Sequence, residues 1–362
     1  MAPADSSSLD TTMLRKTRNF LVERGQDMED ALGGSAKIVK TLLAVLLIYL
    51  LVVIVLGIWW SSEPDSFNVS ENSAQLAEAQ GHKEVTGYVT TATMIRLMDT
   101  LLTKPGGYIS NDVLPPGVWM DNMSNWEFGV LVQVRDLTRA LRREISRSQS
   151  QSTEDRSLVI AEPAFHFNND AWILPSTESE YENGIKAMRN YLQRLADPTD
   201  KQAQFYARAD NLQSWLQDVG TRLGSLSQRL SESVGKEQFD MDLVARIGAD
   251  GLEEQPESQR IKTSFTEIDD VFYQARGTAY ALIHLLKAVE KDFESILGSK
   301  NARVSLAQII VELEATQATV WSPMILNGGG FGVFANHSLA MASYISRANA
   351  AIIDLRNLLE RG

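Results

Sequence analysis

Three carboxylic acids in the N-terminal half are the residues whose chemistry we weigh first. Asp112, Asp121 and Glu127 fall in or just after a stretch rich in turn-forming residues, Gly106 to Gly117. Carboxylates can bind a cation, and a suitably spaced pair can act as acid and base on a glycosidic bond. They are our catalytic candidates for a hydrolase or transferase acting on cell-wall or lipid material. The alternative is a structural connection in which Asp121 caps the following helix.

A series of arginines follows at helical spacing. Steps of three and four residues place its members on one broad side of a helix: Arg135, Arg139, Arg142, Arg143 and Arg147. Such a basic side can dock onto an acidic partner, anionic lipid headgroups or wall polymers. In an acidic chain, pairing with carboxylates of neighbouring helices explains the same pattern. Both interpretations stay open at this point.

A run of glycines near the C-terminus is a third candidate. Gly328, Gly329 and Gly330 interrupt the helical pattern, and the backbone amides of a glycine-rich loop can hold an anion. The same glycines suit a tight connection that lets two helices close on each other. We keep the loop as a candidate site for ligand or partner binding beside this structural interpretation.

Four histidines and no cysteine limit the metal chemistry of the chain. His166 and His337 lie in polar segments, and we keep them as candidates for ligand or partner contacts. His284 falls away from the apolar seam of its helix, so we expect it at the surface. No HExxH or comparable ligand spacing occurs, and thiolate sites and disulfides need cysteine. The sequence therefore predicts no metal site and no cofactor.

The elements that must position these residues begin with a long apolar run. Residues 41–60 contain no charged side chain and end in Trp59 and Trp60. As a helix, ~20 such residues span the ~30 Å hydrocarbon core of a bilayer, and tryptophans favour its edges. We therefore predict one transmembrane helix in contact with the lipid bilayer. A buried core helix and a cleaved signal peptide are the alternatives, and the long segment before the run disfavours the second.

The charges flanking this run predict its direction. Six basic residues precede it, and the first one after it is Lys83. Because Lys and Arg are retained on the cytoplasmic side, we expect the N-terminus inside and residues 61–362 outside the cytoplasmic membrane. Residues 1–40 hold six basic and six acidic residues, so the whole formal charge of −12 lies beyond the run. So acidic a region is a poor partner for nucleic acid.

Composition and periodicity divide the chain into four parts. Residues 1–40 form a tail, in which residues 12–32 have the spacing of a short amphipathic helix. Residues 41–60 are the predicted membrane helix, and residues 61–82 are polar enough for a linker. Residues 83–362 form one helical domain.

The pattern beyond the linker is helical. Apolar residues recur at alternating steps of three and four in three seams, at 205–230, 265–296 and 341–359. The segments 150–176 and 235–262 lack this spacing, so we expect the first to be largely irregular and the second to be an exposed loop or a frayed helix. The sequence thus predicts an all-α fold: a single transmembrane helix plus an extracytoplasmic bundle of about seven helices, several of them long and heptad-patterned.

Several long motifs also resemble a known family. They are Gly106–Asp112, Pro115–Met123, Asn125–Asp136, Ser148–Asp155 and Trp172–Glu178. These motifs are similar to those of the domain of unknown function 2333 family of Gram-negative bacterial proteins, which is uncharacterised. The resemblance implies a bacterial inner-membrane protein with a periplasmic domain. It implies no reaction and no catalytic residue.

The leading functional hypothesis is a non-enzymatic one. The seams, the predicted anchor and the lack of a recognisable catalytic set favour a membrane-tethered periplasmic domain that binds or scaffolds envelope components. An envelope protein or a second copy of the chain is the expected partner. One alternative is an envelope hydrolase or transferase using carboxylates of the 106–127 region. The other is a ligand sensor, which would signal through a partner because the N-terminal tail is too short for an output domain.

Overall fold

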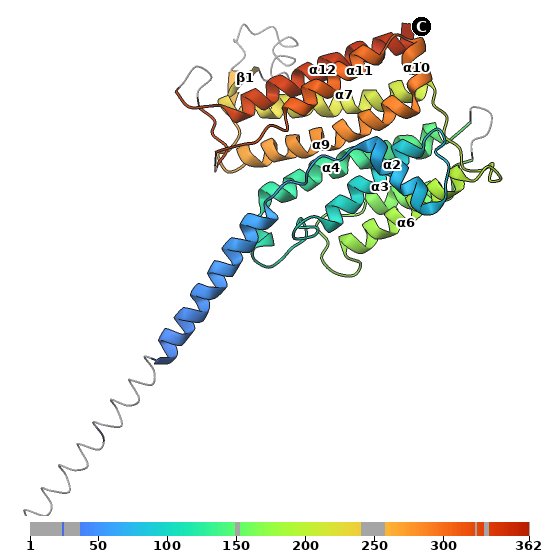
Figure 1. The fold of residues 1–362 in the computed structure, drawn as a ribbon. Coiled ribbons are helices and arrows are strands. Elements are labelled where there is room, and N and C mark those ends of the chain that lie inside the picture. The colour runs from blue at the N-terminus through green and yellow to red at the C-terminus, as the bar shows by residue number, and fades with distance from the viewer. Residues whose placement is uncertain are drawn as a thin grey trace, which may run out of the picture. The chain divides into compact units, whose positions relative to one another are not determined.

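The chain forms two compact units, Met1–Ile58 and Trp59–Gly362. The computed structural model (Figure 1) describes Arg24 and residues 37–148, 153–239, 258–322, 324–328 and 333–361. The amphipathic helix predicted at 12–32 lies outside these ranges apart from Arg24. Among the described residues, one helix, Lys37–Trp60, is long and apolar enough to cross a membrane. Only 6% of its most apolar window is buried, which disfavours the core-helix alternative.

The second unit is a bundle of helices, as the seams predicted, but its described residues contain ten α-helices where about seven were expected. In chain order they are α2 (Val69–Gln80), α3 (Tyr88–Thr103), α4 (Asp121–Ala140), α5 (Leu158–Phe165), α6 (Thr177–Ala196), α7 (Ala209–Ser231), α9 (Ile268–Asp292), α10 (Glu294–Ser299), α11 (Arg303–Ala315) and α12 (His337–Arg361). Three short turns of other helix types are η1 (Gly117–Trp119), η2 (Leu141–Ile145) and η3 (Glu232–Val234). The all-α fold class is confirmed.

The helices α4 and α9 pack against each other at the centre of the bundle. Two glycines let their backbones touch. A Cβ on Gly129 would lie 2.3 Å from the carbonyl oxygen of Gln274, and one on Gly277 would lie 2.0 Å from that of Trp126. Both distances are below any van der Waals contact, so no larger residue fits without separating the two helices.

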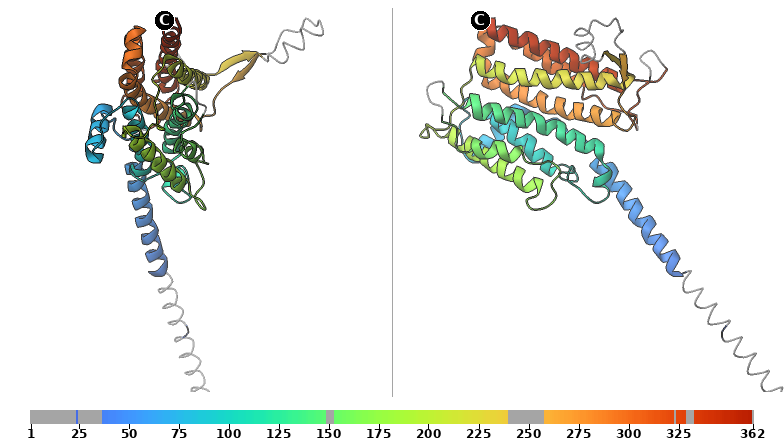
Figure 2. Two further views of the ribbon diagram at one scale, coloured as in Figure 1. Left: turned by 90° about the vertical axis from the view of Figure 1, so that its right-hand side faces the viewer. Right: turned by 180° about the vertical axis from the view of Figure 1, so that it is seen from behind.

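The other helices form two groups around this pair. On one side α12 packs on α7 and α11, which also contact α9. On the other side α6 packs on α3 and α5, α3 contacts α4 and α9, and α5 contacts α4. Figure 2 shows the long helices running side by side, with connections gathered at the two ends. One buried apolar cluster extends through both groups, with Trp126 and Trp215 among its largest members.

The predicted linker at 61–82 is wrong in part, because α2 occupies most of it. Asn68 caps this helix, since its side-chain oxygen accepts hydrogen bonds from the backbone N–H groups of Ser70 and Glu71. The buried residues of α2 are Val69, Ser73 and Ala77. Two of these three are small and weakly apolar, so hydropathy did not reveal the face.

Two further expectations need correction near helix ends. The 150–176 segment contains α5 despite Pro163, because Leu158, Ala161 and Phe165 bury one face. The seam at 265–296 is interrupted: Phe265 is 79% exposed, α9 ends at Asp292, and α10 starts after the buried Phe293.

The 235–262 segment contains a short antiparallel ladder rather than only a loop or helix. Strand β1 (Lys236–Phe239) pairs with β2 (Ser258–Ile261), and Lys236 lies opposite Ile261. Figure 2 shows the two strands projecting from the bundle. The strands are too short and polar to give a recognisable alternation of apolar residues.

Candidate functional site

Glu127, one of the three catalytic candidates, is fully buried and holds a loop together. Its carboxylate lies 2.7 Å from the ammonium of Lys104, which is also buried. It accepts hydrogen bonds from the backbone N–H groups of Ile109 and Ser110, both at 2.9 Å, and from the Ser110 hydroxyl. Burial raises the pKa of Glu127, while Lys104 and these donors oppose the shift. Every oxygen is engaged inside the protein, so the group braces the α3–α4 connection.

The other two carboxylates lie in different surroundings. Asp112 is half-buried beside Gly117, whose missing side chain makes room for it. Burial raises the pKa of Asp112, and Glu178 adds to the shift. Asp121 is exposed at the start of α4, where its Oδ1 accepts from the backbone N–H of Asn122 at 2.9 Å. Neither lines the groove described below.

The arginines of α4 point into ion pairs and backbone contacts of the bundle. Arg135 donates to the carbonyl oxygens of Phe165 and Phe167 at 2.6 and 2.7 Å. Arg139 pairs with Asp136 and Asp218, each at 2.9 Å.

The series continues in the same way in η2. Arg142 pairs with Glu154 at 2.8 Å and with Glu162 at 2.6 Å. Arg143 lies 3.7 Å from Glu162. Of the two interpretations of the series, the structure supports internal pairing with neighbouring helices.

The glycine-rich loop closes as a hairpin before α12. The N–H of Gly328 donates to the carbonyl of Ala335 at 3.3 Å. His337 joins the two sides, since its N–H donates to the Leu326 carbonyl and its Nδ1 accepts from the Leu326 N–H, both at 2.9 Å. Gly329 and Gly330 lie outside the described residues. His166 is exposed, and its Nδ1 lies 2.9 Å from the carbonyl oxygen of Glu162.

A row of side chains on α9 holds the segment that follows the apolar helix. Arg276 makes two parallel hydrogen bonds to Glu63, at 2.7 and 2.8 Å. One turn on, the hydroxyl of Tyr280 donates to the carbonyl of Asp65 at 3.0 Å. Arg276 also donates to the carbonyl oxygens of residues 316 and 318, at 3.0 and 2.9 Å, after the end of α11. The chain is therefore fixed to the bundle within a few residues of Trp60.

His284 completes this row and was predicted wrongly to be exposed. It is 1% exposed and stacks on Phe67, with ring centroids 4.0 Å apart. Its Nε2 accepts from the N–H of Phe67 at 3.1 Å, so its Nδ1 donates to the Tyr280 carbonyl at 2.7 Å. Burial lowers the pKa of His284 to about 4, which keeps the ring neutral. The sequence did contain a signal for this row, because Arg276, Tyr280 and His284 are spaced by four residues and so lie on one side of a helix.

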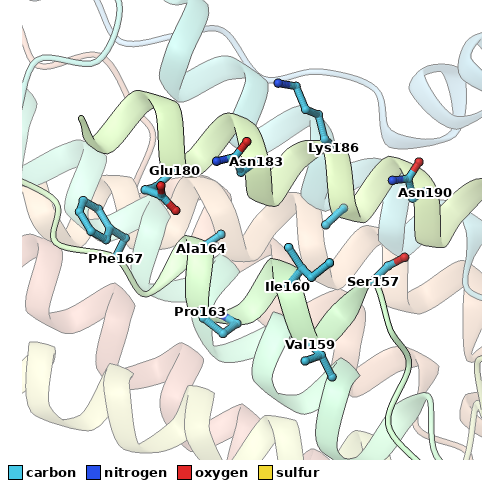
Figure 3. Close-up of a pocket in the computed structure, with 11 residues that line it drawn as sticks. Ser157, Val159, Ile160, Pro163, Ala164, Phe167, Glu180, Asn183, Lys186 and Asn190 are labelled. Atoms are coloured by element: carbon cyan, nitrogen blue, oxygen red, sulfur yellow. The ribbon is translucent and has the colours of Figure 1, made fainter. Parts of the chain in front are cut away.

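An open groove of about 540 Å³ lies between α5 and α6 (Figure 3). Apolar side chains of α5 line one side, and amide and charged side chains of α6 line the other. The residues that matter most are Val159, Ile160, Pro163, Asn183, Lys186 and Asn190. Ile160 is 58% exposed, so the apolar strip of the groove is open to solvent.

Two local features shape this groove. Gly184 brings α6 close to α5, because a Cβ there would lie 2.4 Å from the Phe165 ring. Pro163 has no N–H to donate to the carbonyl of Val159 one turn earlier, so that carbonyl lacks its usual helical partner. Asn183 and Asn190 lie seven residues apart, on one side of α6. The groove therefore offers an apolar strip beside groups that can donate and accept hydrogen bonds.

Comparison with known proteins identifies one family. The family model described as "Uncharacterized protein conserved in bacteria (DUF2333)" matches residues 34–362. No curated protein matches the chain. No solved structure matches it either.

Proposed function

The chain belongs to the uncharacterised bacterial family DUF2333, and from this premise we propose that it is a membrane-anchored binding module of the bacterial envelope. The helix Lys37–Trp60 would cross the inner membrane. The cluster of basic residues before it and their absence from residues 41–82 favour a cytoplasmic N-terminus and a periplasmic bundle. The bundle would act without chemistry, by holding another envelope component close to the membrane.

The observation that carries this proposal is the groove between α5 and α6. An extended peptide presents N–H and C=O groups along its edges, which pair well with amide side chains such as Asn183 and Asn190. Its alternate side chains meet the neighbouring surface, here the apolar strip of Val159, Ile160 and Pro163. The proposed occupant is therefore an extended segment of another envelope protein.

A photoreactive residue in the groove tests this directly. A benzophenone amino acid would replace Ile160 in the full-length protein in living cells. The matched control carries it at Val311 on α11, because the two side chains are equally exposed, at 58% and 57%. We expect a discrete adduct at position 160 that is absent at 311 and is lost when Asn183 and Asn190 are both changed to Ala. The same adducts at both positions, or none at 160, would overturn the proposal.

A second experiment tests the predicted side of the membrane. The chain has no cysteine, so a single one introduced at Val304, which is 81% exposed, is the only thiol present. A membrane-impermeant maleimide should label it when only the outer membrane is permeabilised. Labelling that needs disruption of the inner membrane would refute the periplasmic assignment.

The alternative of a carboxylate-based hydrolase receives less support. It drew on Asp112, Asp121 and Glu127 as acid and base. Glu127 has no exposed surface and forms an ion pair with Lys104, so it does not contact a substrate in this conformation. The three carboxylates also differ sharply in burial, from a fully buried Glu127 to an exposed Asp121.

A further inference from the structure

Large exposed apolar side chains gather on the connections at one end of the bundle. We call this the proximal end and define it as the end where Trp60 and Glu63 lie. The exposed residues there are Val113, Leu114, Val118 and Trp119 between α3 and α4, Trp172, Ile173 and Leu174 between α5 and α6, Phe265 before α9, and Trp321, Met324, Val333 and Phe334 between α11 and α12. Exposed apolar surface on this scale marks an interaction site.

Hydrogen bonds and packing place these connections at the same end. The amide of Asn111 donates to the Ala171 carbonyl at 3.0 Å, which joins the α3–α4 and α5–α6 connections. Gly106 lies against the ring of Trp60, where a Cβ would be 2.7 Å away. The Arg276 contacts described above bring the end of α11 to Glu63. In Figure 1 the α11–α12 connection lies on the left of the bundle, opposite the C-terminus.

The tryptophans separate into two classes by position. Trp126 and Trp215 fill the core, with at most 1% exposure. The other five lie at the proximal end: Trp59 and Trp60 before the bundle, and Trp119, Trp172 and Trp321 on its connections, exposed by 64, 58 and 92%. Tryptophan combines a large apolar ring with one N–H donor, and it concentrates where a bilayer meets water.

The charges of the same connections fit a translocated face that touches lipid. Residues 106–125, 166–178, 264–270 and 316–337 contain no Lys or Arg. Their exposed carboxylates include Asp121, Asp170 and Glu267. Such a surface avoids anionic headgroups and matches the ammonium groups of zwitterionic lipids.

The segment leading into the bundle is too short and too well fixed to hold this end away from a bilayer. Glu63 is bound to Arg276, and Trp60 packs against the core. The intervening residues reach at most ~10 Å when fully extended. If the apolar helix ends in the membrane, the proximal end of the bundle must therefore lie at the membrane surface.

We propose that the proximal end docks on the outer surface of the inner membrane, with the Trp119, Trp172 and Trp321 connections inserted among zwitterionic lipid headgroups. The proposal rests on the proposed membrane anchor and deepens it. Docking would hold the bundle in one orientation, with its groove at a fixed height above the membrane. A second copy of the chain, or another protein, is the competing occupant of this surface.

Single-cysteine labelling of the full-length protein in proteoliposomes tests the docking. An environment-sensitive NBD fluorophore would be attached at Leu114→Cys or Ile173→Cys, or at Val304→Cys near the start of α11 as the exposed control. We expect nitroxide-labelled phospholipids to quench the first two probes several-fold more than the control. We expect iodide in the buffer to show the opposite order.

Further variants separate docking from folding and from other contacts. The double variant Trp119→Asp with Trp172→Asp should restore iodide quenching of the probe at position 114 without lowering the melting temperature. The control variant Val311→Asp should leave the quenching of that probe unchanged. Equal lipid quenching at all three probes, in protein that resists carbonate extraction, would overturn the docking and leave the anchor intact. Extraction by carbonate would overturn both. If the probes at positions 114 and 173 are protected from iodide only at a high protein-to-lipid ratio, the surface contacts another protein and the lipid proposal is overturned.

Discussion

The two ends of the bundle share one device, a buried carboxylate that accepts hydrogen bonds from backbone N–H groups, and differ in what surrounds it. At the proximal end, the α3–α4 connection buries an ion pair, Glu127 with Lys104, and exposes Trp119. At the opposite end of the bundle, which we call the distal end, the carboxylate of Asp292 accepts hydrogen bonds from the N–H groups of Gly87 and Thr90, both at 2.7 Å, and so caps α3. The proximal carboxylate also pairs with a buried ammonium, and its connection lies among large exposed apolar side chains and exposed carboxylates. The comparison shows that the proximal end, which we propose to dock on lipid, combines a rigid connection with an exposed apolar surface.

Breaking the buried ion pair should have the largest effect. Glu127→Ala leaves the buried Lys104 ammonium without its counter-charge, with the Gly107 carbonyl as its remaining acceptor, and leaves two buried backbone N–H groups without acceptors. We therefore expect a loss of about 3–5 kcal/mol in unfolding free energy. Chemical unfolding of the full-length protein in detergent would measure it. Adding Lys104→Met should recover part of the loss, because the unpaired charge is removed as well. If Glu127→Ala alone is as stable as the parent protein, the ion pair with Lys104 does not stabilise the fold.

Acid should weaken the row on α9. The pKa of His284 is about 4 in the folded protein against 6.5 when unfolded, because the ring is buried. The unfolded state therefore binds the proton more readily, and the stabilisation present above pH 6.5 is lost as the pH falls towards 4. This difference between the folded and unfolded pKa corresponds to about 3 kcal/mol of unfolding free energy. Unfolding at several pH values, compared with His284→Gln, isolates the effect, and identical pH slopes for the two proteins would contradict it.

Removing the distal cap should cost less than breaking the proximal brace. Asp292→Ala leaves the first N–H groups of α3 without acceptors, and we expect a loss of about 1–2 kcal/mol. Burial raises the pKa of Asp292, which offsets part of what its hydrogen bonds contribute. Thermal unfolding checks the value, with Asp292→Asn as the variant that keeps an acceptor. A loss equal to that of Glu127→Ala would remove the contrast between the two ends.

The smallest expected effect concerns an acidic cluster at the proximal end. Burial and the nearby Asp121, Asp269 and Glu267 raise the pKa of Asp270 to about 6. Its ionised form therefore destabilises the folded state above that pH, and Asp270→Asn should stabilise the protein at pH 8 by about 0.5 kcal/mol, since the site is partly solvated. The gain should vanish below pH 4, where both states are protonated. A variant that is less stable at pH 8 would reverse the assigned sign.

Sequence periodicity predicted the elements whose burial is one-sided. The seam at 341–359 lies within α12, where Met341, Ile345, Ile352 and Leu355 are buried. It failed for His284, because α9 is central and is buried on nearly all sides, including off its seam. It also failed for α2, whose buried face contains small residues.

The candidate site could be predicted only in part. The arginine series of α4 was visible, with internal pairing as one of its two interpretations. The groove was not visible, because it arises where α5 and α6 meet over Gly184 and Phe165, and neither helix shows it alone. Likewise, the apolar residues of the proximal end are scattered over four connections, which only the packed bundle brings together.

The row on α9 also determines how the molecule would bear mechanical load. A pull on a partner in the groove would travel through the packed helices to α9, and from there to the chain at Glu63 and Phe67. Arg276 holds Glu63 through two parallel hydrogen bonds, Tyr280 holds Asp65, and His284 holds Phe67. When a chain is peeled from a helix, the contact nearest the pull carries most of the load, so the contact of Glu63 with Arg276 would break first and the contacts of Asp65 and Phe67 would then take up the load. The bundle thus resists being peeled from its own N-terminal segment.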